Sequence, residues 1–155
     1  MITSKQIAKL SAVFEKHGVV LAYLFGSHAK GRVTPRSDVD IAVLFPEPYD
    51  KRAGWDARLS LIGEVEAICR CEGDVVPLNE APPLLKHQVL KYGKPIYVPD
   101  GKVRVSFTVR ALQEFRDVEP MIDRHQAALF KRIREGRFLD GLRPNSNIGT
   151  DPTHS

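Results

Sequence analysis

The longest apolar run in the chain, residues 19–25, ends abruptly at Gly26-Ser27. The run is rich in β-branched and aromatic residues, which is typical of a strand buried in a sheet. It is far shorter than the roughly 20 residues that a helix needs to cross a bilayer. This feature therefore predicts a buried strand that delivers the chain into a tight turn, and it argues against a membrane protein.

The N-terminal stretch and the cysteines indicate a cytoplasmic protein. Lys5 and Lys9 lie among polar residues, so the first residues do not form the apolar core of a secretory signal. Cys69 and Cys71 are accompanied by no second Cys pair and by no His at metal-ligand spacing, so a structural zinc site is not expected. The formal net charge of +4 is mild, and no basic stripe interleaved with aromatic residues predicts direct binding of nucleic acid.

Stretches with helical spacing alternate with further short strands. Thr3 and Gln6 predict a capping box at the start of a first helix, which Gly18 ends. Alternating side chains over residues 38–45 predict a second strand, whereas residues 103–109 fit either a helix or a strand. The other expected elements are helices over residues 55–71, 84–92 and 121–136 and strands over residues 74–78 and 94–98. This alternation predicts an α/β fold in which one sheet is covered by helices.

The length of 155 residues suits a single domain, which we assign to residues 1–143. After Arg143 the sequence contains one large apolar residue, Ile148, among polar residues, glycine and prolines. Such a composition cannot bury enough apolar surface to order the chain. Residues 144–155 are therefore predicted to be a disordered tail.

Two short motifs follow one another at the ends of the first two predicted strands. Gly26-Ser27 ends the first strand, and Asp38-Val39-Asp40 begins the second. Strand residues two apart point to one face, so both carboxylates can converge on a pair of divalent cations about 3.5–4 Å apart. A glycine turn with a neighbouring hydroxyl suits phosphate oxygens. Each motif alone also fits an ordinary turn or a solvated strand end, and their succession is what favours a nucleotide site.

These residues carry a family resemblance. The stretch GSHAKGRVTPRSDVDIAV, residues 26–43, resembles the signature of the minimal nucleotidyltransferases (MNT), a branch of the polymerase-beta-like nucleotidyltransferase superfamily. Residues 73–97 are similar to the next strand, the Pro-rich helix start and the final strand of that family, and residues 115–136 resemble the carboxy-terminal helix of MNT proteins encoded beside HEPN-domain partners. The resemblance implies the polymerase-beta palm, a small mixed sheet covered by helices, followed by carboxy-terminal helices.

The resemblance also implies roles for individual residues. Gly26 and Ser27 would hold the β- and γ-phosphates of ATP, and Asp38 and Asp40 would ligate Mg²⁺. Asp74 would be the third carboxylate, which completes the metal site and helps to deprotonate the attacking hydroxyl. The three aspartates are therefore the predicted catalytic and metal-binding residues.

Further nucleotide-binding candidates lie between the two motifs. Many relatives have Arg directly after Gly-Ser, but this chain has His28, followed by the basic residues Lys30, Arg32 and Arg36. Of the residues in this loop, Lys30, Arg32 and Ser37 are the candidates for contacting the nucleotide. Which basic side chain neutralises the triphosphate stays open at this point.

The implied activity is magnesium-dependent transfer of AMP from ATP to a hydroxyl. MNT proteins with this carboxy-terminal helix resemble antitoxins that modify a tyrosine of a HEPN ribonuclease toxin encoded by a neighbouring gene. Two alternatives remain: an antitoxin that masks its partner without catalysis, and a small-molecule nucleotidyltransferase of the aminoglycoside type. All three possible functions are compatible with a homo- or hetero-oligomer.

Overall fold

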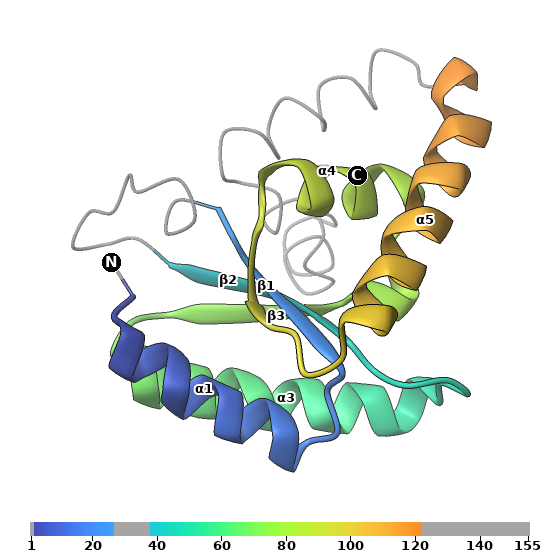
Figure 1. The fold of residues 1–155 in the computed structure, drawn as a ribbon. Coiled ribbons are helices and arrows are strands. Elements are labelled where there is room, and N and C mark those ends of the chain that lie inside the picture. The colour runs from blue at the N-terminus through green and yellow to red at the C-terminus, as the bar shows by residue number, and fades with distance from the viewer. Residues whose placement is uncertain (1, 27–37, 122–155) are drawn as a thin grey trace, which may run out of the picture.

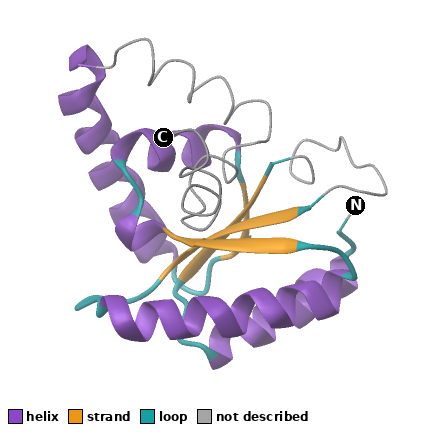
Figure 2. Cartoon of the chain, turned by 180° about the vertical axis from the view of Figure 1, so that it is seen from behind, coloured by secondary structure: helices purple, strands orange, loops and turns teal. Residues whose placement is uncertain are grey.

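A computed structural model describes residues 2–26 and 38–121 of the chain. Figure 1 shows a central sheet with α1 and α3 packed beneath one face and with α4 and α5 on the other side. The view from behind in Figure 2 shows the same layers. The helix predicted over residues 121–136 falls almost wholly outside the described residues, as does the tail of residues 144–155.

The described residues form four helices and four strands with the following bounds. The helices are α1 (Ser4–Lys16), α3 (Lys51–Cys69), α4 (Pro83–Tyr92) and α5 (Gly101–Val118). The strands are β1 (Leu21–Phe25), β2 (Val39–Leu44), β3 (Gly73–Pro77) and β4 (Lys94–Tyr97). Short 3₁₀ turns cover Leu78–Glu80 (η1) and Glu119–Met121 (η2).

The sheet is mixed, with strand order β3-β2-β1-β4. β1 is antiparallel to both β2 and β4, whereas β2 and β3 are parallel. The parallel pair needs a crossover connection, and α3 provides it. This arrangement confirms the predicted mixed sheet covered by helices.

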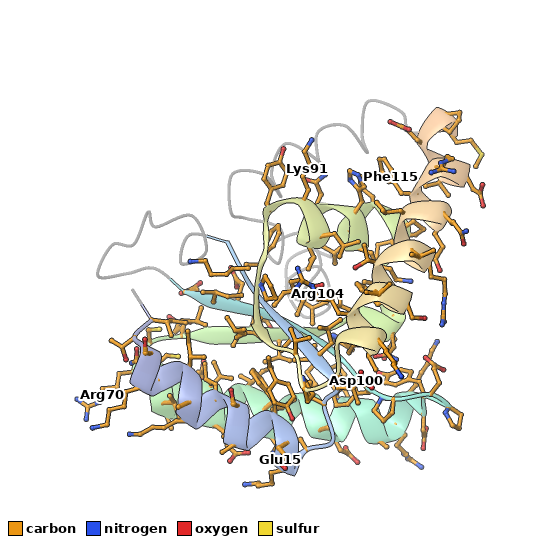
Figure 3. All side chains as sticks on the ribbon, viewed as in Figure 1. Glu15, Arg70, Lys91, Asp100, Arg104 and Phe115 are labelled. Carbon is orange, nitrogen blue, oxygen red and sulfur yellow. The ribbon has the colours of Figure 1, made fainter. Side chains whose placement is uncertain are left out.

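Capping interactions explain where the helices begin and end. The predicted capping box is present, because Gln6 N donates to Thr3 Oγ1 at 3.1 Å and Thr3 N donates to Gln6 Oε1 at 2.9 Å. α3 begins four residues earlier than predicted, since the Asp50 carboxylate accepts a hydrogen bond from Arg52 N. It ends at Arg70, which adopts a left-handed conformation with φ 57° and is labelled in Figure 3.

The ambiguous stretch at residues 103–109 is helical. Asp100 caps the start of α5 by accepting from Lys102 N at 2.9 Å. Phe107, Ala111 and Phe115 then recur at helical spacing and are buried. Figure 3 labels Phe115, whose ring stacks on that of His87 in α4 with centroids 3.8 Å apart. Packing against α4 therefore selects the helix over the strand.

Each face of the sheet has its own apolar core, because successive strand residues point to opposite sides. The core beneath α1 and α3 includes Phe14, Ile41, Leu61 and Val75. The core beneath α4 and α5 includes Tyr23, Phe25, Ala42, Leu85 and Phe107. No helix within residues 2–26 and 38–121 is long and apolar enough to span a bilayer.

The first core can be tested with two leucines of α3. Leu61 is completely buried, whereas Leu59 is 52% exposed. Leu61→Ala is expected to lower the free energy of unfolding by about 2–5 kcal/mol, because it leaves a cavity, and Leu59→Ala by no more than about 0.5 kcal/mol. Urea denaturation followed by circular dichroism measures both values. Equal losses in the two variants would contradict the assigned packing of α3.

Candidate active site

The strand pairing brings three predicted site residues together where β1 ends and β2 and β3 begin. Phe25, which precedes Gly26, is the antiparallel partner of Asp40, and Asp40 is in turn the parallel partner of Asp74. The end of β1 and the starts of β2 and β3 therefore meet at the same place. Gly26, Asp40 and Asp74 come together here from three separate segments of the chain.

Asp40 and Asp74 are both nearly buried, with 6% and 4% of their surface exposed. As in-register partners on neighbouring strands they point to the same face, which is the face of Phe25 and Ala42 beneath α4. Two ionised carboxylates at the spacing of neighbouring strands, about 4.8 Å, would repel by roughly 3 kcal/mol at an effective dielectric constant of about 20. Positive charge near these strand ends would therefore stabilise the two carboxylates.

Gly26 makes the closest approach to this pair. Its φ is +79°, and a Cβ at this position would lie 2.6 Å from Asp40 Oδ2. Only glycine combines a left-handed backbone with the absence of a side chain that would push the carboxylate away. The glycine of the predicted phosphate-binding turn therefore also leaves space for the carboxylate of the Asp-x-Asp motif.

Asp74 is held by two donors from its own surroundings. Its Oδ1 accepts from Arg58 Nη2 at 3.0 Å and from Val75 N at 2.8 Å. Arg58 also donates from Nε to the carbonyl oxygen of Val75 at 2.5 Å. Sequence reasoning missed Arg58, because it lies sixteen residues before Asp74 in another element and no local motif marks it.

Asp38 directly precedes β2 and is half-buried. In the part of the chain that the structure describes, no three His, Cys, Asp or Glu side chains are grouped closely enough to hold a metal ion. Asp74 is instead paired with the Arg58 guanidinium. The metal site formed by all three aspartates therefore stays a prediction, although carboxylate oxygens are the donors that Mg²⁺ prefers.

The two cysteines lie at the end of α3 and in the turn before β3. Burial, followed by the neighbouring Cys71, raises the pKa of Cys69 to about 11. Burial and then the carboxylate of Asp38 raise the pKa of Cys71. Both thiols therefore lose their proton less readily than a free cysteine does.

The remaining predicted nucleotide-binding residues, Ser27, Lys30, Arg32 and Ser37, lie outside the described residues, as do His28 and Arg36. Their assignment to the triphosphate stays a prediction. The described site thus consists of Gly26, the partnered Asp40 and Asp74, Asp38 at the entrance to β2, and Arg58.

A comparison with known protein families identifies the class of this domain. The family model "Polymerase beta, Nucleotidyltransferase" matches residues 8–102, which include all the described site residues. The chain therefore belongs to the polymerase beta nucleotidyltransferase family, as its resemblance predicted.

Among its relatives are enzymes named for protein modification. The chain is 35% identical over 77 residues to "Protein adenylyltransferase MntA" of Shewanella oneidensis, and the match covers 50% of this chain and 52% of the relative. It is also 35% identical over 85 residues to a putative protein adenylyltransferase of Methanocaldococcus jannaschii, covering 53% of this chain and 84% of that protein. The matched stretch is thus about half the length of the Shewanella relative.

The fold is similar to that of a chain in the crystal structure of a toxin-antitoxin with AMP-PNP. The TM-score is 0.63 at 26% sequence identity, and the alignment covers 77% of this chain and 92% of the other. This similarity confirms the predicted fold.

Two glycines with the same backbone conformation test the role of Gly26. Gly18 has φ +76°, and a Cβ added there would have no atom within 4 Å, whereas a Cβ at Gly26 would meet Asp40. Alanine at either position is expected to lose about 1–2 kcal/mol of stability from the left-handed backbone. Only Gly26→Ala is expected to weaken binding of MgATP, by at least about tenfold, which corresponds to about 1.4 kcal/mol.

Isothermal titration calorimetry with MgATP measures this difference, and thermal unfolding checks that both variants fold. Equal MgATP affinity in the Gly18→Ala and Gly26→Ala variants would show that Gly26 is a turn residue and nothing more.

Proposed function

We propose that the protein is a magnesium-dependent adenylyltransferase that moves AMP from ATP to a hydroxyl, most specifically a tyrosine of a HEPN ribonuclease toxin, and thereby acts as its antitoxin. The observation that carries the proposal is the in-register placement of Asp40 and Asp74 beside Gly26. This geometry provides two buried carboxylates next to a glycine turn. In this proposal the chain is cytoplasmic, and its partner is encoded by a neighbouring gene.

Four of the described site residues have a part in the proposed reaction. Asp38 and Asp40 would hold Mg²⁺ together with Asp74, and such an ion would neutralise charge on the triphosphate and would favour departure of pyrophosphate. Gly26 allows the backbone to approach the phosphates closely. Asp74 accepts the proton of the acceptor hydroxyl while the oxygen of that hydroxyl attacks the α-phosphorus. The bond from the α-phosphorus to the bridging oxygen then breaks, and pyrophosphate leaves.

The comparisons support this assignment in two ways. The curated relatives are named protein adenylyltransferases, which favours a protein acceptor over a small molecule. The structural relative is a toxin-antitoxin that holds an ATP analogue, which favours ATP as the donor and a toxin as the partner. The resemblance of residues 115–136 to MNT proteins encoded beside HEPN partners agrees with both.

The direct test is transfer of labelled AMP to the product of the neighbouring gene. The protein, Mg²⁺, labelled ATP and the purified neighbour are incubated together, and mass spectrometry locates the added AMP. We expect the label on a tyrosine of the neighbour. A stable complex that carries no label would contradict the proposed function.

Variants of the Asp-x-Asp motif distinguish catalysis from masking. Asp38→Asn combined with Asp40→Asn is expected to lower the transfer rate by at least about 100-fold, because the ligands for the cation are lost. Asp56→Asn removes an exposed carboxylate of α3 and serves as the matched control. If the double variant still neutralises the toxin in cells at normal expression, the protein masks its partner and does not silence it by transfer.

A further inference from the structure

Arg58 reaches Asp74 from the opposite layer of the molecule. It belongs to α3, which packs on the face of the sheet where Val75 is buried. Asp74 precedes Val75 and points to the other face, where Val76 contacts the second core. Because β3 is the last strand in the order β3-β2-β1-β4, the Arg58 side chain passes around its edge to reach the carboxylate.

Arg58 makes one contact that caps the edge strand β3 and a second contact that such capping does not need. A donor to the Val75 carbonyl would satisfy the exposed edge of β3. Arg58 uses Nε for that carbonyl and Nη2 for the carboxylate of Asp74, so one guanidinium binds both groups. The arrangement exploits the planar fork of arginine, which lysine lacks.

The environment of the ion pair makes it a strong constraint on Asp74. The side chains of Arg58 and Asp74 are 13% and 6% exposed. The guanidinium also lies over the Trp55 ring, with its central carbon 5.2 Å from the ring centroid. A pair so withdrawn from water is screened little, and stacking and hydrogen bonds restrict the rotamers of both partners.

We propose that Arg58 is a positioning residue of the nucleotidyltransferase site, which holds the Asp74 carboxylate oriented beside Asp40 and supplies positive charge there until a divalent cation is bound. This inference rests on the proposed function, since it assigns to Asp74 a part in cation binding. Arg58 does not touch the nucleotide in this role. It acts through Asp74, as an outer-shell partner orients a metal ligand.

Thermal unfolding with and without Mg²⁺, at matched ionic strength and without nucleotide, separates this role from edge capping. Arg58→Met keeps the length and apolar stem of the side chain but removes its charge. The variant is expected to melt lower than the wild type in the absence of Mg²⁺, and saturating Mg²⁺ is expected to restore more than half of the loss. Arg52→Met makes the same change of charge at an exposed position of α3, and it should show no Mg²⁺ effect beyond that of the wild type.

Arg58→Lys keeps the charge but cannot bind both acceptors in the same way. It is expected to melt lower than the wild type, with a Mg²⁺ effect no larger than that of the wild type. A loss of stability in Arg58→Met that Mg²⁺ does not reduce would overturn the proposal and leave Arg58 as an edge cap of β3.

Steady-state kinetics provide the second readout. Arg58→Met is expected to lower kcat for AMP transfer by about 10–100-fold with little change in KM for ATP. An unchanged kcat would overturn the role of Arg58 while the wild type still transfers AMP. In contrast, a wild type that neither transfers AMP nor binds Mg²⁺ would overturn the proposed function itself.

Discussion

The juxtaposition of two buried carboxylates, Asp40 and Asp74, is the constraint on which the described site depends. Parallel pairing of β2 with β3 places the two residues directly opposite each other. Buried like charges are unfavourable unless cations or donors compensate them. The ion pair with Arg58 and the hydrogen bond from Val75 N provide part of that compensation. The negative charge of the two carboxylates therefore favours binding of a cation at this site.

The fold produces this arrangement through its connections. β1 and β2 run antiparallel, so the end of one and the start of the other lie together, and the α3 crossover returns the chain so that β3 starts beside β2. The same crossover helix carries Arg58 along the edge of β3. One connection therefore supplies both the second carboxylate and its ion-pair partner, while the two apolar cores keep the sheet rigid between the helix layers.

Much of this arrangement was predictable because its signals are local. The capping box of Thr3 and Gln6, the buried strand ending at Gly26, and the Asp-x-Asp motif each depend on neighbouring residues. The start of α3 at Lys51 was missed, although Asp50 is a suitable cap, and residues 103–109 were ambiguous until their contact with α4 was known. The pairing of Asp40 with Asp74 and the reach of Arg58 are long-range properties of strand order, which periodicity does not encode.

The most direct test of the central claim is the position of a divalent cation in crystals of the protein grown with Mn²⁺ and a non-hydrolysable ATP analogue. Mn²⁺ is a hard cation with the ligand preference of Mg²⁺, and its anomalous scattering locates it without ambiguity. The account predicts an anomalous peak at bonding distance from carboxylate oxygens of Asp38 and Asp40, with the triphosphate next to Gly26. A bound nucleotide whose Mn²⁺ lies away from Asp40 would contradict it.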